Sequence, residues 1–470
     1  MTRGLLLTAA ALTRLLAPCG ALAARAAEPP TASMVQEALR GGVPEALPAA
    51  GPVRLTLQDA IARGLQHNLA AVLADAGLRG ARGARLEALA GVLPSLSAGL
   101  SASRQIISLE EFGFPVAPGE SPLIGPFEVV RGQLDLTETI GWGAIEHARA
   151  GGDRLSAARE SQRDVRELVV TAVAGLYLRA VTSGTRVEAA RAQLATAQAL
   201  ATRAEDMSRA GTVAGIEVLR ANVQLAAQKQ RLIQAENDEA RHRLSLSRAI
   251  GLPLDRELEL VDRAPYLGIE ALGVDEAVDQ ALRTRADLKA AEASLRAAEH
   301  EGRAAFGEAL PSLHLGAELA GVGPRASEAK RVYALVARVS VPLFEGGRAQ
   351  AQIAQARAAL DRQRARVADL RARIEYEVRT ARLDLEASAQ QVVVAREARD
   401  LAERQVQQAE DRFAAGVASN IEVVEAQQAL AEATERYLSG SMAHNLSTLA
   451  LARALGVAEA EAAPFPSGEL

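Results

Sequence analysis

An internal repeat constrains this chain more than any other feature. The segment 211–231, GTVAGIEVLRANVQLAAQKQR, matches the segment 416–436, GVASNIEVVEAQQALAEATER, at an offset of 205 residues. Nine positions in and just before the two segments are identical, including the turn glycines Gly211 and Gly416. Each copy predicts a glycine-containing turn between two long, alanine-rich helices. The duplicated unit is therefore a helical hairpin.

Composition agrees with long helices and excludes some partners. Apolar residues make up 49% of the chain, but aromatic residues only 3%. Alanine-rich chains with few aromatics suit helices that pack closely along their length. The 53 basic and 58 acidic residues leave a net charge of −5, which gives no reason to expect a nucleic-acid partner.

The N-terminus predicts export. Residues 1–27 combine a basic start, an apolar run and small residues, as in a cleaved secretory signal. The only cysteine, Cys19, lies within them, so the mature chain has no disulfide or cysteine metal site. A lipoprotein signal ending at Cys19 stays open, although Pro18 stands where a small residue is preferred. Residues 28–54 are rich in proline and predict a linker, and no later stretch predicts a transmembrane helix.

Four segments change from helical to alternating periodicity. They start near Leu93, Gly132, Leu310 and Tyr333, and each predicts a strand with one apolar and one small or polar face. Four prolines in 104–131 predict a loop between the first two strands. The strand starts are 217 residues apart and the hairpin turns only 205, which places a 12-residue insertion in that loop, within 113–126.

The remaining pattern predicts one very long helix in each repeat, from about 145 to 208 in the first and from about 348 to 413 in the second. In the second helix, apolar residues keep to a seven-residue phase, with one step of eleven after Ile374. They are Ile353, Leu360, Val367 and Ile374, and then Leu385, Val392, Val406 and Phe413. A heptad sustained this long predicts coiled-coil packing, with helices near 100 Å at about 1.5 Å per residue.

Four strands cannot close a barrel in lipid, because two edges would stay open. Small barrels need about eight strands, so other copies of the chain must complete the sheet. Eight strands would make a dimer and twelve a trimer, and periodicity does not decide between them. The alternative is a soluble antiparallel sheet that covers a helical bundle. The export signal and the low charge of the apolar faces favour the barrel.

The chain resembles the TolC-like outer-membrane efflux protein family over about 55–457. The resemblance rests on LTLQDAIARGLQHN at 55–68, the LPSL strand starts, VSVPLFEGGR at 339–348 and FAAGVASNIEVVEAQ at 413–427, in an order repeated twice. It implies a mainly α fold with a membrane β-barrel part. Two tandem repeats, 55–262 and 263–457, would be followed by a tail, 458–470. Each repeat would give long coiled-coil-like helices and two strands to a homotrimeric 12-stranded β-barrel in outer-membrane lipid, continued by a periplasmic α-helical tunnel.

The resemblance also assigns functional residues. The turns should be tips that dock a periplasmic adaptor (membrane fusion) protein linked to an inner-membrane pump: Gly211, Thr212, Val213, Gly416, Val417 and Ala418. Some relatives carry a basic residue at the place of Ala418, so a latch that uses a cation there is not expected. The acids Glu422 and Glu425 should line a periplasmic gate, although Glu422 also suits a capping box with Ser419. The aromatics Trp142, Tyr333 and Phe344 are assigned to the membrane interface of the barrel.

Neither the residues nor the resemblance suggests an enzyme. The six histidines are scattered, no catalytic elbow or phosphate loop is present, and no cofactor or metal is expected. The resemblance implies the exit duct of a tripartite efflux pump or a type I secretion system, with an unspecified substrate. The alternative is a periplasmic coiled-coil structural or adaptor protein without a pore, which would not need four strands suited to lipid.

Overall fold

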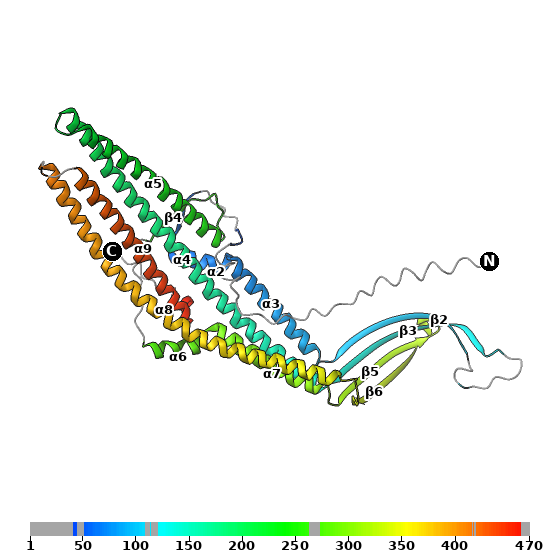
Figure 1. Cartoon of the computed structure of the whole chain (residues 1–470). Helices are drawn as coiled ribbons and strands as arrows, with labels where there is room; N and C mark the ends of the chain where they lie inside the picture. Colours follow the sequence, from blue (N-terminus) through cyan, green and yellow to red (C-terminus); the bar gives the residue numbers. More distant parts are fainter. Residues whose placement is uncertain are drawn as a thin grey trace.

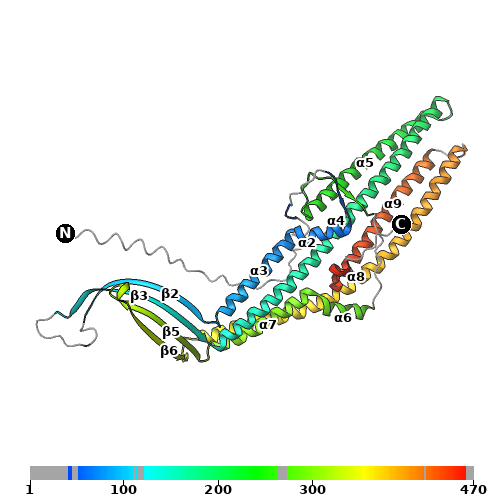
Figure 2. The same ribbon diagram turned by 180° about the vertical axis from the view of Figure 1, so that it is seen from behind.

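The computed structural model describes residues 41–44, 51–108, 113, 121–262, 273–415, 417 and 420–461. They form an elongated molecule in which a sheet lies at one end and the turns of two long helical hairpins lie at the other (Figures 1 and 2). Between the two ends, helices from both repeats run side by side.

The first repeat begins with α2 (Leu57–His67) and α3 (Leu69–Ala90). The predicted capping box is present, because the Thr56 hydroxyl accepts from the Asp59 backbone and the Asp59 carboxylate accepts from the Thr56 backbone. After the first two strands, α4 (Trp142–Arg209) runs for 68 residues and returns as α5 (Gly215–Ala249). The predicted long helix and its hairpin partner are confirmed.

The second repeat follows the same order. It contains α6 (Val274–Thr284), α7 (Ala286–Gly307), α8 (Arg348–Ala414) and α9 (Asn420–Leu455), and then a short α10 (Ala458–Glu461). The heptad positions of α8 face its neighbours, as predicted. Four are buried and four half-buried: Val367, Ile374, Val392 and Phe413, then Ile353, Leu360, Leu385 and Val406.

Four strands form one antiparallel sheet in the order β2 (Ser95–Ser108), β3 (Leu123–Ile140), β5 (Ser312–Gly323) and β6 (Lys330–Ser340). A 3-10 turn (Ala326–Glu328) joins the last two. The outer strands β2 and β6 each pair on one side only, so the sheet has two open edges.

The predicted loop at 104–131 is wrong at both ends, since β2 continues to Ser108 and β3 begins at Leu123. Pro126 is tolerated because the register between β2 and β3 shifts between Gln105 and Ile107, where regular pairing is interrupted and a missing N–H costs no ladder bond. The prolines Pro115 and Pro118 lie outside the described residues. The last strand also ends earlier than the alternating pattern, before Pro342.

The main core joins both repeats near the middle of the molecule. Side chains of α2, α3, α4 and α5 form one buried cluster with Leu449 of α9. Two short parallel strands that the sequence did not predict, β1 (Val53–Leu55) and β4 (Leu258–Leu260), add to it. The buried Tyr177 hydroxyl donates to the Asp262 carboxylate at 2.9 Å, and the same carboxylate accepts from the Leu57 backbone at 2.8 Å.

One described helix, α4, is long and apolar enough to cross a membrane by length and composition alone. Just over half of its apolar window (56%) is buried within the chain, because α4 packs against α3, α5, α7 and α9. The window is therefore the core of the helical bundle, which explains an apolar helix without a membrane span.

Candidate functional site

The turn between α4 and α5 is built by one glycine. Gly211 has a φ of +75°, a conformation that glycine adopts without a steric penalty. Its N–H donates to the Ser208 carbonyl at 3.0 Å, and the Thr212 N–H donates to the Met207 carbonyl at 2.9 Å. This pair of bonds is the Schellman motif, which satisfies carbonyls left free at a helix end. Gly211 and Thr212 are exposed, and Val213 is half-buried.

The turn between α8 and α9 has a matching bond, since the Val417 N–H donates to the Arg412 carbonyl at 3.0 Å. Val417 is exposed. Gly416 and Ala418, which the sequence also assigns to this tip, lie outside the described residues. Both turns are at the end of the molecule opposite the sheet (Figure 1).

A small apolar cluster joins the two hairpins just behind the tips. Phe413 packs with Val423 and Ala426, and Leu200 and Met207 of α4 pack against this group. The cluster fixes the second hairpin on the long helix of the first.

The two acidic gate candidates have different surroundings. Glu422 forms an ion pair with Arg412 across the hairpin, with a nitrogen–oxygen distance of 2.9 Å. Glu425, one turn further along α9, is exposed and pairs with no described residue. In the first hairpin Glu217 pairs instead with Arg220 on its own helix, at 2.8 Å. The equivalent place to Arg412 is Met207 there, so the cross-hairpin ion pair belongs to the second tip alone.

The ion pair between Arg412 and Glu422 is not predicted by the sequence patterns. A signal was available, because the two residues lie at similar distances before and after the predicted turn. Ser419, the predicted cap of this helix, lies outside the described residues.

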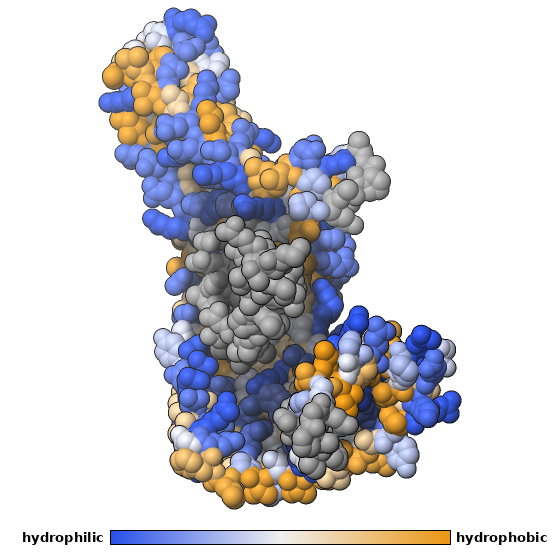
Figure 3. All heavy atoms as spheres, turned by 90° about the vertical axis from the view of Figure 1, so that its right-hand side faces the viewer, coloured by the Kyte–Doolittle hydropathy of each residue, from blue (hydrophilic) through white to orange (hydrophobic). Residues whose placement is uncertain are grey.

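The sheet has two chemically different faces, as the alternation predicts. One carries apolar side chains on all four strands, among them Leu96, Leu134, Leu136, Leu319 and Leu335, and all five are exposed. The opposite face carries serines, Asp135, His314, Glu318 and Arg338, and its Arg131 pairs with Glu318 at 2.8 Å. Figure 3 views the molecule from the sheet side and shows hydrophobic atoms over its lower part.

The three aromatics assigned to the membrane interface are exposed to different degrees. Trp142 at the start of α4 is 48% exposed, Tyr333 on β6 79%, and Phe344 between β6 and α8 88%. Trp142 and Phe344 lie at the helical end of the sheet, and Tyr333 lies nearer its loop end.

A buried charge cluster lies where α4, α7, α8 and α9 meet. Arg453 of α9 pairs with Asp164 and, at 3.1 Å, with Glu167 of α4, while Arg285 pairs with Asp287 at 2.6 Å. Burial raises the pKa of Asp164 and of Glu167, and Arg453 opposes that rise. Asp164 and Asp287 are buried, so this cluster stabilises the packing between the two repeats and is not accessible to a ligand from solvent. Among the described residues, no group of histidines and acids could hold a metal ion.

A sheet with one exposed apolar face, at one end of helices about 100 Å long, is the arrangement expected of an outer-membrane protein with a helical extension. Comparison with known proteins agrees. Residues 277–457 match the outer membrane efflux protein family. Over these residues the chain is similar to the TolC-like outer-membrane efflux proteins.

Two relatives and one solved structure illustrate the likeness. The chain is 28% identical over 412 residues to the pyoverdine export outer membrane protein OpmQ of Pseudomonas putida, which covers 84% of each sequence. It is 26% identical over 394 residues to OpmQ of Pseudomonas aeruginosa, which covers 82% of this chain and 81% of the relative. The crystal structure of the outer membrane protein VceC from Vibrio cholerae matches with a TM-score of 0.74 at 22% identity, covering 85% of this chain and 96% of VceC.

Proposed function

We propose that three copies of the chain form one duct, which receives substrates from a periplasmic adaptor and an inner-membrane pump and releases them outside the cell. The observation that carries the proposal is the sheet: it has an exposed apolar face, a polar face and two open edges. In lipid the edges must pair, and pairing β6 of one copy with β2 of the next closes a barrel of twelve strands from three copies.

An exposed apolar seam on α8 supports the same assembly. Tyr376, Leu383, Val394 and Leu401 are all 61–69% exposed. They are spaced by seven, eleven and seven, which repeats the stutter of the heptad that packs inside the chain. Such a seam is suited to a neighbouring helix, and a copy placed edge to edge with the sheet would supply one.

The tips suit adaptor docking because they combine small residues with exposure. A partner hairpin can approach closely at Gly211 and Thr212, and on the other tip Val417 offers apolar surface. The unpaired carboxylate of Glu425 suits a ring of charge at the entrance, with three copies around the threefold axis. Glu422, which is neutralised in part by Arg412, would contribute less to that ring.

The cargo follows from the relatives rather than from the site. Since the OpmQ proteins are named for pyoverdine export, pyoverdine is the first cargo to test. The helical duct serves efflux and type I secretion equally well.

The test is a deletion strain complemented with the full chain. Outer-membrane fractions should contain an oligomer that migrates differently before and after heating, and export of the cargo should return with it. A chain that stays in the periplasm without heat-modifiable migration would support the poreless adaptor instead.

A further inference from the structure

One carboxylate interrupts the apolar face of the sheet. Glu138 lies on β3 on the same face as Leu134 and Leu136, because residues two apart in a strand share a face. Its neighbour on β5 is Leu315, and the next residue in that row, on β6, is Ala337. An acid among these side chains needs a physical reason, because charged side chains on a lipid-facing surface cost free energy.

The position of Glu138 supplies part of that reason. Of the other charges on this face, Arg104 and Glu128 lie opposite one another on β2 and β3 at the loop end, and Arg331 is the second residue of β6. Ten residues separate Glu128 from Glu138, about 34 Å along a strand, or about 25 Å of height at a tilt near 40°. That is the height of the apolar band of an outer-membrane barrel. Glu138 therefore marks the periplasmic border of the band.

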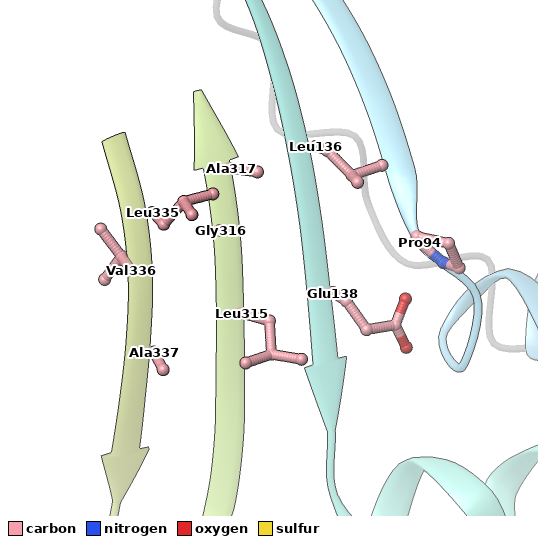
Figure 4. Close-up of a pocket in the computed structure, with 9 residues that line it drawn as sticks. All are labelled: Pro94, Leu136, Glu138, Leu315, Gly316, Ala317, Leu335, Val336 and Ala337. Carbon is pink, nitrogen blue, oxygen red and sulfur yellow. The ribbon is translucent and has the colours of Figure 1, made fainter. Parts of the chain in front are cut away.

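The carboxylate lies in a groove on the sheet (Figure 4). The groove measures about 400 Å³ and is lined mainly by aliphatic side chains, including Leu136, Leu315 and Leu335, with Pro94 beside Glu138 at one end. The Oε2 atom of Glu138 is buried and has no hydrogen-bond partner among the described residues. A buried carboxylate oxygen without a partner is costly, so the site favours a cation.

A second copy of the chain does not supply that cation from its sheet. On the described strands, the basic residues of the apolar face are Arg104 and Arg331, both at the loop end, and Arg338 lies on the opposite face. A copy that pairs with either edge brings apolar residues of β2 or β6 to the level of Glu138. Lipid around the barrel is the source that remains once the sheet of a second copy is set aside.

We propose that this groove binds a phospholipid of the periplasmic leaflet, with an acyl chain along the leucines and a primary ammonium headgroup at Glu138. A primary ammonium both carries the charge and donates N–H bonds to the carboxylate, whereas a quaternary ammonium has no N–H to donate. The site should therefore bind phosphatidylethanolamine, which has a primary ammonium, better than phosphatidylcholine, which has a quaternary one, although the two lipids have the same net charge. This inference rests on the proposed barrel, since only then does the apolar face meet lipid.

The experiment uses the full-length oligomer reconstituted in nanodiscs that contain equal amounts of phosphatidylethanolamine and phosphatidylcholine. After detergent extraction and washing, the lipids that stay bound are measured by native mass spectrometry. The wild-type protein should retain phosphatidylethanolamine over phosphatidylcholine about tenfold, as expected for one hydrogen-bonded charge pair. Glu138→Gln should abolish the preference. Glu128→Gln is the matched control, because it makes the same change on the same face at the other end, and it should keep the preference.

Equal retention of the two lipids by the wild-type protein overturns the site, and so does an unchanged preference in Glu138→Gln. If that variant does not assemble, the wild-type comparison alone decides. A wild-type chain that forms no heat-modifiable oligomer contradicts the proposed duct, whereas an oligomer without headgroup preference contradicts only the lipid site.

Discussion

The guanidinium of Arg203 on α4 lies 5.4 Å from the ring centroid of Phe413 on α8. This cation–π contact joins the two hairpins close to their tips, where the apolar cluster around Phe413 is small. Because the group of side chains that joins the hairpins this close to the tips is small, each contact in it affects how freely the tips move.

Replacing Arg203 by Ala should loosen the second tip without unfolding the chain. A cation–π contact at an exposed site contributes about 0.5–1 kcal/mol, so local opening should become about two- to fivefold more frequent. Hydrogen exchange of the first turns of α9 measures that change. Arg203→Lys keeps the cation and should lie near the wild-type rate, and equal protection in all three proteins would show that the contact contributes nothing.

The buried cluster gives a sharper prediction for stability. Arg453→Met removes the cation that compensates two buried acids, Asp164 and Glu167, and should cost about 3–5 kcal/mol at neutral pH. The control is Arg166→Met, which breaks a half-exposed pair with Glu459 and should cost under about 1 kcal/mol.

The Arg453→Met variant should also respond to pH with a definite sign. Burial already raises the pKa of both acids, and loss of Arg453 raises them further. An acid with a raised pKa in the folded state favours folding while it is protonated, so the stability of the variant should fall as the pH rises above about 4. Thermal midpoints at pH 5 and pH 8 check this, and a variant that is more stable at pH 8 would contradict the assignment.

The sequence predicted the large elements because their signals extend over many residues. Heptads of α8 and the alternation in the strands are long periodic patterns that tertiary contacts reinforce. The predicted loop at 104–131 was wrong because its prolines suggested a loop throughout. Pro126 instead lies in β3, where the strand register shifts and accommodates it. The parallel pair β1 and β4 could not be predicted from strands of three residues each. The ion pair of Arg412 with Glu422 and the contact of Phe413 with Arg203 depend on how helices are placed in space. Local sequence patterns do not contain that information.

Deleting residues 109–120 should leave assembly intact. The sequence places the 12-residue insertion within 113–126, but residues from Leu123 onward belong to β3, so the deletion is made between Ser108 of β2 and Leu123 of β3. Loops between strands accept length changes at small entropic cost, and the second hairpin needs only the short segment 324–329. Heat-modifiable migration of the variant measures assembly. Loss of the oligomer would contradict a topology with these residues at the extracellular mouth.

Replacing Gly416 by Trp should abolish transport while the barrel still assembles. An indole at the tip blocks close approach by a partner hairpin, which small residues permit. Gly416→Ala is the matched control, because it removes the glycine with little added bulk and separates turn strain from docking. Export assays and adaptor cross-linking measure the two effects, and full transport in the Trp variant would remove the tip from the docking surface.

The final prediction concerns the entrance. Three copies of an unpaired carboxylate at a constriction attract cations, so the reconstituted trimer should be cation-selective and blocked by multivalent cations from the periplasmic side. Changing both Glu422 and Glu425 to Ala should remove the block and leave folding nearly unaffected. Because Arg412 already neutralises part of Glu422, Glu425→Ala alone should remove most of it.

Single-channel recordings with a trivalent cation on the periplasmic side measure how much Glu422 and Glu425 each contribute to the block. Glu422→Ala frees Arg412, which adds a positive charge near the entrance and should itself weaken the block. The double change Glu422→Ala with Arg412→Ala removes one charge of each sign and should restore the block toward the wild-type level, since Glu425 remains. Glu217→Ala, the corresponding acid of the first hairpin, should leave the block unchanged. A Glu422→Ala, Glu425→Ala protein that is blocked as strongly as the wild type would mean that these carboxylates lie away from the entrance, and that Glu422 serves the hairpin through Arg412.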